Sequence, residues 1–190
     1  MPKSFTEQEK QNLRNALVEE CKKSWSLHGY KKTSVGELCA KVGISTGAFY
    51  AFFESKESLF MAVMESFQHS TLNMFKEILT PPTKENLCIA LKKLYMEYAE
   101  NDIITKRHSP DYRALLNKLP AEWRANHSAT SEKNLEHTFF APGLKLKKSK
   151  DDIHKILDTL LLTVANKEMH HNHYEIFCLL LDCVIPELYE

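Results

Sequence analysis

Apolar residues recur every three or four positions along most of the chain, and strand-like alternation is absent. This period is typical of amphipathic helices, and only five glycines interrupt it. The pattern predicts an all-α fold of about nine helices. They are expected near residues 6–28, 34–42, 46–52, 55–80, 83–100, 110–118, 120–139, 149–167 and 172–186.

Residues that begin and end helices stand at several of these boundaries. Ser34 is followed three positions later by Glu37, and this spacing is typical of a capping box, in which each side chain accepts from the other residue's backbone N–H. Ser45 and Ser55 can cap the next two helices, while Gly29 and Gly43 can end helices through left-handed backbone conformations. The sequence thus predicts two short helices joined by a glycine turn.

These two short helices have the outline of a helix-turn-helix, whose second helix lies in the major groove of DNA. Phe49 and Phe53 are four positions apart, so both are expected to face inward. Small side chains on the outer face allow close approach to base edges and thymine methyl groups, and a tyrosine hydroxyl can donate to a phosphate. The residues at or near that face are Thr46, Gly47, Ala48, Tyr50, Ala51 and Phe52.

Lys56 stands in the first turn of the next predicted helix. A cation there opposes the helix dipole, so the position is locally unfavourable. It is favourable if the helix amides and the ammonium together bind a phosphate. The alternative is a solvated surface lysine.

Residues 29–60, GYKKTSVGELCAKVGISTGAFYAFFESKESLF, resemble the DNA-binding domain of the TetR family of bacterial transcriptional regulators. The resemblance fades beyond about Ser70. Five elements carry it, in order and without gaps: Gly29-Tyr30, Thr33-Ser34-Val35, Gly43-Ile44-Ser45, Gly47-Ala48-Phe49-Tyr50 and Phe53-Glu54-Ser55-Lys56-Glu57-Ser58-Leu59.

The resemblance implies an N-terminal three-helix DNA-binding domain at 6–54, with the motif at about 34–53. A helical ligand-binding and dimerisation domain would follow at 55–190. Thr33, Tyr50 and Lys56 would contact phosphates. Family members often carry Lys or Arg where this chain has Thr46, so base readout here would rest on van der Waals contacts and DNA shape. The complete set of expected DNA-binding residues is Thr33, Ser34, Ser45, Thr46, Gly47, Ala48, Tyr50, Ala51, Phe52 and Lys56.

The last two predicted helices are apolar on more than one side. Such a helix needs two partners, so one side is expected to cover its own domain and the other to pair with a second copy. The resemblance implies the same homodimer, which would read a palindromic operator about its two-fold axis. The alternative is a self-contained bundle core. If the interface forms, Leu181→Glu should disrupt the dimer.

Aromatic residues in the middle helices, such as Tyr95 and Trp123, fit two interpretations. Aromatic side chains in helical patterns usually belong to a core. The resemblance implies instead that this region encloses a pocket for a small-molecule inducer. The sequence assigns neither the lining residues nor the chemistry of that ligand.

Composition adds little about partners but bounds the compartment. The formal net charge is zero, with a surplus of two positive charges through Phe60 (nine Lys/Arg against seven acids). The polar start, MPKSFTEQEK, lacks the apolar core of a signal peptide, and no apolar run reaches the length of a membrane span. Five scattered cysteines fit buried thiols in a reducing compartment. We expect a cytoplasmic protein without a membrane partner.

The sequence thus favours a dimeric, ligand-responsive transcriptional regulator, with repression expected over activation. No enzymatic activity, catalytic residue, cofactor or metal is expected. The alternative is a helical-bundle enzyme or a metal- or pH-sensing protein that uses His170, His171 and His173. Those histidines do not share one helical face, and the sequence has no glycine-rich phosphate loop and no HExxH motif. A helical interaction module that no longer reads DNA is a third possibility.

Overall fold

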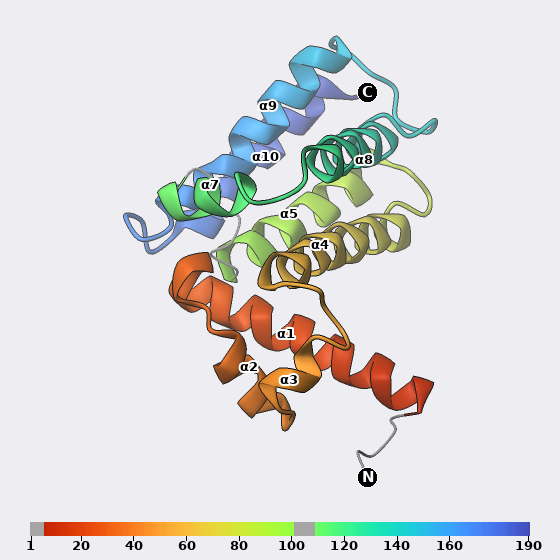
Figure 1. Cartoon of the computed structure of the whole chain (residues 1–190). Coiled ribbons are helices and arrows are strands. Elements are labelled where there is room, and N and C mark those ends of the chain that lie inside the picture. The colour runs from red at the N-terminus through yellow and green to blue at the C-terminus, as the bar shows by residue number, and fades with distance from the viewer. Residues whose placement is uncertain (1–5, 101–108) are drawn as a thin grey trace. The chain divides into compact units, whose positions relative to one another are not determined.

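The computed structural model describes residues 6–100 and 109–190, and in this part of the chain the fold is all-α, as predicted (Figure 1). The first five residues of the polar N-terminal stretch lie outside it. No β-strand occurs in the described ranges, where an isolated antiparallel bridge joins Leu146 to Tyr189. The helices are α1 Glu7–Lys32, α2 Val35–Val42, α3 Thr46–Phe49, α4 Lys56–Ile78, α5 Lys84–Glu100, α7 Pro110–Leu116, α8 Ala121–Phe139, α9 Lys150–Leu162, the 3-10 helix η1 Thr163–Asn166 and α10 His173–Leu188.

The chain divides into two compact units, which are described separately. The described part of the N-terminal unit comprises residues 6–67 and 109–124, and that of the C-terminal unit comprises 68–100 and 125–190. These packing units differ from the domains expected at 6–54 and 55–190, because the first half of α4 and all of α7 pack in the N-terminal unit. The two expected domains are functional divisions and stay a prediction.

The core of the N-terminal unit forms along one side of α1. The helical period predicts one stripe of Leu13, Leu17, Cys21 and Trp25; the last three are buried, and Leu13 is half-buried. The Trp25 ring lies 4.8 Å from Phe60 of α4 and stacks on Tyr112 of α7 at 6.0 Å. Burial of each such aromatic side chain contributes about 1.5–3 kcal/mol. Burial also raises the pKa of the Cys21 thiol to about 12.

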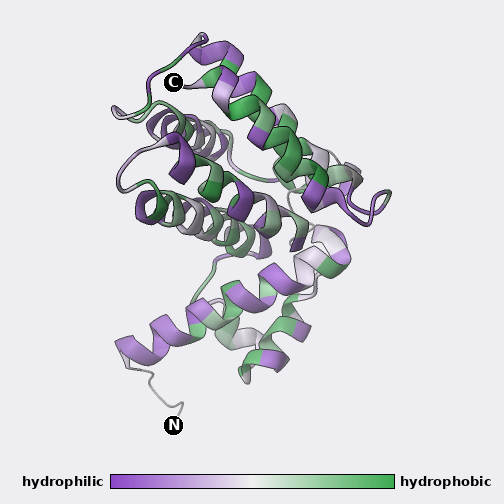
Figure 2. Cartoon of the chain, turned by 180° about the vertical axis from the view of Figure 1, so that it is seen from behind, coloured by the Kyte–Doolittle hydropathy of each residue, from purple (hydrophilic) through white to green (hydrophobic). Residues whose placement is uncertain are grey.

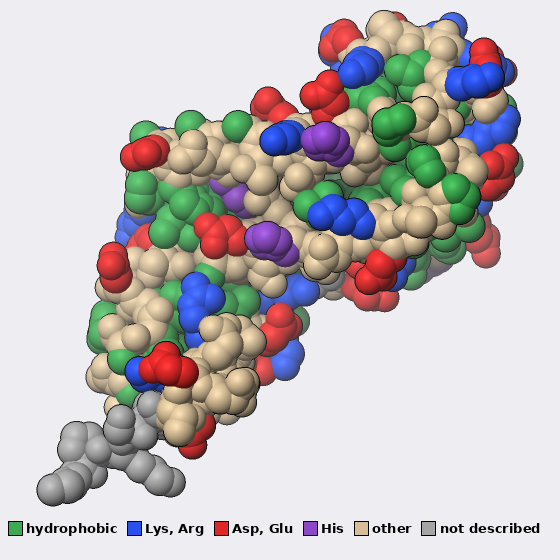
Figure 3. All heavy atoms as spheres, turned by 90° about the vertical axis from the view of Figure 1, so that its right-hand side faces the viewer, with side chains coloured by type: hydrophobic (Ala, Val, Ile, Leu, Met, Phe, Trp, Pro, Cys, Tyr) green, Lys and Arg blue, Asp and Glu red, His purple; other side chains and the backbone are tan. Residues whose placement is uncertain are grey.

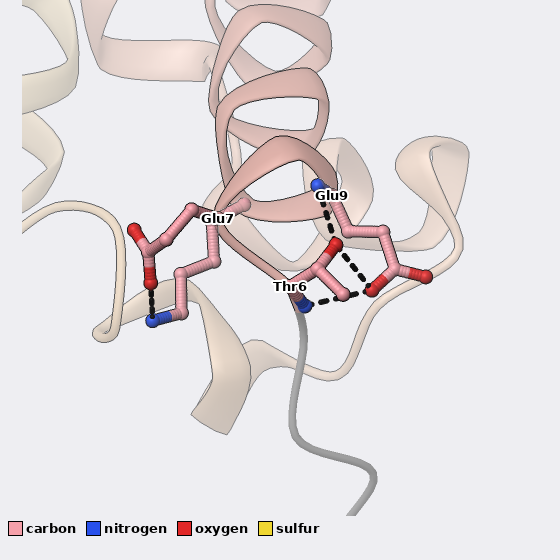
Figure 4. A network of polar contacts seen from close by, with 4 residues as sticks. Thr6, Glu7 and Glu9 are labelled. Atoms are coloured by element: carbon pink, nitrogen blue, oxygen red, sulfur yellow. Dashed lines mark hydrogen bonds and ion pairs between the residues drawn. The ribbon is translucent and has the colours of Figure 1, made fainter.

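The start of α1 has a complete capping box (Figure 4). The backbone N–H of Glu9 donates to the Thr6 hydroxyl at 3.2 Å, and the backbone N–H of Thr6 donates to the Glu9 carboxylate at 2.8 Å. Glu7 and Lys10 form an ion pair at 2.6 Å beside it. These local bonds satisfy donors that the first turn of a helix otherwise leaves unpaired.

The two predicted glycine positions adopt positive φ, but in different regions. Gly43 has φ 78° and ψ 30°, the left-handed conformation expected after a helix. Gly29 has φ 80° and ψ 174°, which essentially only glycine adopts, and one further helical turn follows to Lys32. The expected end of the first helix at residue 28 is therefore a kink within α1.

The C-terminal unit is built around α5, α9 and α10. Figure 2 shows hydrophobic positions along much of α10, and the structure sorts them into two rows. The inner row is buried in the core of the unit and consists of Phe177, Leu181, Ile185 and Leu188. The outer row is exposed and consists of Ile176, Leu179, Leu180 and Cys183.

Leu181 therefore corrects one expectation from the sequence. Its side chain is 0% exposed in the core of its own protomer. A charge at this position would disrupt that core before it reached any second copy. Leu181→Glu therefore tests folding, and the proposed dimer has to be tested with a substitution in the outer row.

The C-terminal tail closes the unit. The backbone N–H of Lys147 donates to Leu188 at 2.8 Å, and that of Glu190 donates to Lys145 at 2.9 Å. Tyr189 is buried, and its hydroxyl donates to the carbonyl of Phe139 at 3.2 Å. Burial raises the pKa of this tyrosine. No helix in the described ranges has both the length and the apolarity needed to cross a bilayer.

Candidate nucleic-acid interface

A tight turn fixes α2 against α3. The backbone N–H of Gly43 donates to Ala40 at 3.3 Å, and that of Ile44 donates to Cys39 at 3.0 Å, so two of the last carbonyls of α2 are satisfied. The Ser45 hydroxyl then accepts from Ala48 at 3.1 Å and caps α3. The structure thus forms the predicted helix-turn-helix.

Phe49 and Phe53 hold α3 from the inside. Both side chains are buried, as expected, and their ring centroids lie 5.7 Å apart. The Phe49 ring also meets Tyr50 edge to face at 5.3 Å. Leu38 of α2 is buried in the same unit. These contacts orient the outer face of α3 and leave most of the Tyr50 side chain exposed.

Helix α3, the second helix of the helix-turn-helix, is shorter than expected. It ends at Phe49, whereas the sequence predicted a helix through residue 52. The chain continues in tighter turns, in which Ala51 donates to Ala48 at 3.1 Å and Phe52 donates to Phe49 at 2.9 Å. Bonds to the third preceding residue are common where a helix ends.

The outer face of α3 and its extension is open. Tyr50 is 61% exposed, and its hydroxyl has no hydrogen bond within residues 6–100 and 109–190. Such an unpaired, exposed hydroxyl can donate to a phosphate. Ser45, Thr46, Gly47 and Ala51 are also exposed, while Ala48 and Phe52 are half-buried.

Thr33 occupies a different place from the one its expected role requires. It is 2% exposed, and both its backbone N–H (3.2 Å) and its hydroxyl (2.8 Å) donate to the Gly29 carbonyl. Its hydroxyl also lies 3.1 Å from that of Ser24, which is buried too. Thr33 therefore locks the α1–α2 junction and has no free donor for a phosphate in this structure.

Ser34 and Ser55 act as helix caps. The Ser34 hydroxyl accepts from Glu37 at 3.4 Å, which is the first half of the predicted capping box. The return bond, from the Ser34 backbone N–H to the Glu37 carboxylate, does not form within the described part of the chain. At α4, Ser55 and Ser58 cap each other, with both backbone-to-hydroxyl distances at 3.0 Å. The sequence identified the Ser55 cap but not this reciprocal arrangement.

Lys56 is half-buried, so it is not the solvated surface lysine of the alternative interpretation. Its Nζ lies 4.5 Å from the Tyr30 ring centroid and 5.9 Å from that of Phe60. It also donates to the Lys31 carbonyl at 3.5 Å. Burial lowers the pKa of this lysine, so the structure holds its ammonium in a fixed, partly desolvated position.

A polar network supports this position from the side of α7. The Tyr30 hydroxyl donates to the Glu57 carboxylate, and this hydrogen bond is the main cause of the lowered Glu57 pKa. Lys118 lies 3.6 Å from the same carboxylate and 5.7 Å from the Tyr30 ring centroid. Lys118 lies 61 residues beyond Glu57 and belongs to no recognisable motif, so sequence reasoning missed it.

An open depression of about 250 Å³ lies in the N-terminal unit, lined in part by Arg14, Phe52, Glu65 and Trp123. The Trp123 indole N–H donates to Glu65 at 2.8 Å. The sequence left two interpretations of Trp123, as a core residue or as a pocket residue, and the structure places it in the lining of this depression. Tyr95, the other such residue, is buried and stacks on Phe177 at 3.9 Å.

The histidine cluster is not arranged as a site. His170 and His171 are exposed in the turn before α10. His173 begins α10 and is half-buried, with its Nδ1 3.3 Å from the Tyr95 hydroxyl. Over the described residues, no three His, Cys, Asp or Glu side chains are grouped to hold a metal ion.

Charge forms no single patch on the face that Figure 3 shows. On the face in Figure 3, acidic and basic side chains are interspersed, and neither sign forms a continuous patch. This distribution agrees with the zero net charge of the chain. The assignment of the interface therefore rests on the geometry of α2, the turn and α3.

Two glycines of the interface give a matched pair of substitutions. A Cβ at Gly36 or at Gly47 would have only ordinary contacts, the nearest at 3.7 Å and 3.8 Å. Gly36→Ala should raise the free energy of unfolding by about 1 kcal/mol, because glycine is unfavourable inside a helix. Gly47→Ala, on the first turn of α3, should instead weaken duplex binding, because its methyl group stands on the outer face. Chemical denaturation and duplex titration measure the two effects; equal duplex affinities for both variants and the wild type would exclude Gly47 from the interface.

The fold and this motif define the class, an all-α protein with an N-terminal helix-turn-helix. Residues 17–63 match the family model described as "Bacterial regulatory proteins, tetR family". The chain is similar to this family over these residues. It is 37% identical over 68 residues to the uncharacterized HTH-type transcriptional regulator YuxN of Bacillus subtilis. That match covers 36% of this chain and 22% of the relative, so the chain spans about a fifth of that relative's length.

Solved structures share the fold over nearly the whole chain. A TetR family transcription regulator from Marinobacter aquaeolei VT8 has a TM-score of 0.70 at 17% identity, covering 97% of this chain and 100% of its own. The regulator FadR from Bacillus subtilis, solved in complex with stearoyl-CoA, has a TM-score of 0.61 at 16% identity, covering 93% and 95%. At these identities the likeness establishes the fold alone.

Proposed function

We propose that the chain is a transcriptional regulator that reads duplex DNA with the outer face of α3. The observation that carries this proposal is the open face around Tyr50, held by the buried Phe49 and Phe53. Small exposed residues at 46, 47 and 51 leave room for base edges. DNA is the partner that this geometry fits, and we propose the cytoplasm as the compartment in which the regulator acts.

The proposed active form is a homodimer. The outer row of α10 has the spacing i, i+3, i+4 and i+7, which forms one apolar stripe on a helix. Leu179 is 65% exposed and Leu180 39% exposed within it. Pairing of this stripe about a two-fold axis would bury it and present two copies of α3 to a palindromic operator.

The proposed signal is a small molecule bound by the C-terminal unit. FadR, which shares the fold, was solved with stearoyl-CoA, and this supports a ligand function for the corresponding unit here. The ligand would release the operator by binding more tightly to a conformation that does not fit DNA. Repression is proposed, and a reporter gene that falls silent on deletion of the regulator would instead indicate activation.

Selection of bound duplexes from a random DNA pool tests this function. The purified full-length protein should enrich a palindromic motif at low salt. Enrichment of a single half-site would support DNA reading but contradict the proposed homodimer. No enrichment, with the protein folded and free of small molecules by mass spectrometry, would contradict the proposed function.

Tyr50 and Lys56 allow the phosphate contacts to be measured. Tyr50→Phe should weaken operator binding by about 1 kcal/mol, because it removes one hydrogen bond and nothing else. Lys56→Ala should weaken binding and also reduce the slope of log K against log[salt] by about 1, because one phosphate contact is lost. Fluorescence anisotropy at several salt concentrations gives both quantities. An unchanged slope for Lys56→Ala would exclude its phosphate contact.

A further inference from the structure

A carboxylate of α7 holds the backbone at the kink of α1. The two carboxylate oxygens of Asp111 accept from two consecutive backbone amides: Oδ2 from Tyr30, and Oδ1 from Lys31 at 3.0 Å. Asp111 is half-buried and lies 80 residues from Lys31 in the sequence. Hydrogen bonds from amides to an ionised acceptor are among the stronger ones in proteins.

The surrounding residues leave space for this contact and hold the Asp111 segment in place. A Cβ at Gly29 would lie 2.6 Å from Asp111 Oδ2, so the glycine gives the carboxylate its space. The segment that carries Asp111 is anchored by Tyr112, which stacks on Trp25 at 6.0 Å, and by Leu115 and Leu119, which are buried. The carboxylate is therefore held against the kink from a packed helix.

The same short stretch of backbone leads directly to the DNA reader. Lys31 gives its N–H to Asp111 and its carbonyl to the ammonium of Lys56. Gly29 gives its carbonyl to both donors of Thr33, next to the cap of α2. Residues 29–33 are thus fixed between α7 on one side and the start of α2 and Lys56 on the other.

We propose that Asp111 is a positioning residue for DNA reading. It never touches DNA; it orients the peptide of Lys31, and through that peptide it sets the position of the Lys56 ammonium. This inference rests on the proposed function, because it concerns the same interface. It adds a requirement that the helix-turn-helix alone does not contain.

The test compares Asp111→Ala and Asp111→Asn with Asp151→Ala in the full-length protein. Asp151 is a matched control, because it is also an acid in the first turn of a helix but pairs with Lys155 in the C-terminal unit. Asp111→Ala should weaken operator affinity about tenfold. Asp111→Asn should fall between it and the wild type, since an amide oxygen can replace only one of the two acceptors. Asp151→Ala should bind as the wild type does.

A double-mutant cycle separates positioning from general loss of stability. If Asp111 acts through Lys56, the effect of Asp111→Ala should shrink in a Lys56→Ala background. Equal effects in both backgrounds would overturn the proposal. If Asp111→Ala does not fold, Asp111→Asn decides, and wild-type affinity of that folded variant would overturn the proposal as well.

Amide hydrogen exchange distinguishes this inference from the proposed function. Exchange at Tyr30 and Lys31 should accelerate in Asp111→Asn and stay unchanged in Asp151→Ala. Suppose that exchange is faster in Asp111→Asn but the wild-type protein selects no duplex. The contact between Asp111 and the backbone would then be supported, and the proposed DNA reading would be contradicted. Unchanged exchange together with unchanged operator affinity would remove the positioning role alone.

Discussion

A Leu179→Glu variant is expected to be a folded monomer that binds its operator about a hundredfold more weakly than the wild type. The side chain is 65% exposed on the outer row of α10, so a carboxylate there is solvated in the monomer and costs little. In the proposed dimer it would face an apolar stripe of the second copy, where an unpaired charge is strongly unfavourable. Sedimentation equilibrium with circular dichroism measures mass and helicity together.

Leu181→Glu is the matched control from the same helix. Its side chain is fully buried in its own protomer, so the carboxylate should cost several kcal/mol of stability, of the order seen for core substitutions. This variant should lose helicity, whereas Leu179→Glu should keep it. A Leu179→Glu protein with the mass of the wild-type dimer would exclude the outer row of α10 from the interface.

Gly29→Ala should destabilise the N-terminal unit by about 3 kcal/mol or more. Backbone conformations with φ 80° and ψ 174° cost a residue with a Cβ about 1–3 kcal/mol, and the new methyl group would also lie 2.6 Å from Asp111 Oδ2. Thermal unfolding followed by the fluorescence of Trp25, which packs beside this turn, reports the loss. Operator binding should be lost with it.

Gly43→Ala is the control for the positive φ alone. Its φ is 78°, but nothing lies within 4 Å of an added Cβ. It should cost only about 1 kcal/mol, the difference typical of glycine against alanine at a left-handed helix end. Similar losses for both variants would show that the space around Gly29 is adjustable. Partial recovery in Gly29→Ala with Asp111→Ala would assign the difference to the carboxylate.

Local chemistry explains what the sequence could predict. The caps at Ser34, Ser45 and Ser55 and the turn at Gly43 depend on neighbours within four residues, so spacing alone reveals them. The inward direction of Phe49 and Phe53 follows from the same short period. The family resemblance then assigned this local pattern to one class of DNA reader.

The features that sequence reasoning missed depend on contacts between distant residues. Nothing near Asp111 indicates that it binds the backbone 80 residues earlier. The sequence does not reveal that the hydroxyl of Thr33 is already used as a donor. It donates to the carbonyl of Gly29, which lies at the kink in α1. Leu179 and Leu181 are equally apolar, so only packing decides which of the two faces the core.

The participation of α7 in the N-terminal unit bears on how proteins of this fold diversify. The unit that contains the reader is discontinuous in the gene, since residues 109–124 complete a unit begun at residues 6–67. A recombination event that exchanges only the first third of the chain would separate Gly29 and Trp25 from Asp111 and Tyr112. The N-terminal unit can therefore be exchanged between relatives only when the gene segments for both of its parts are transferred together or are already compatible. Natural and engineered chimeras of this fold should respect that linkage.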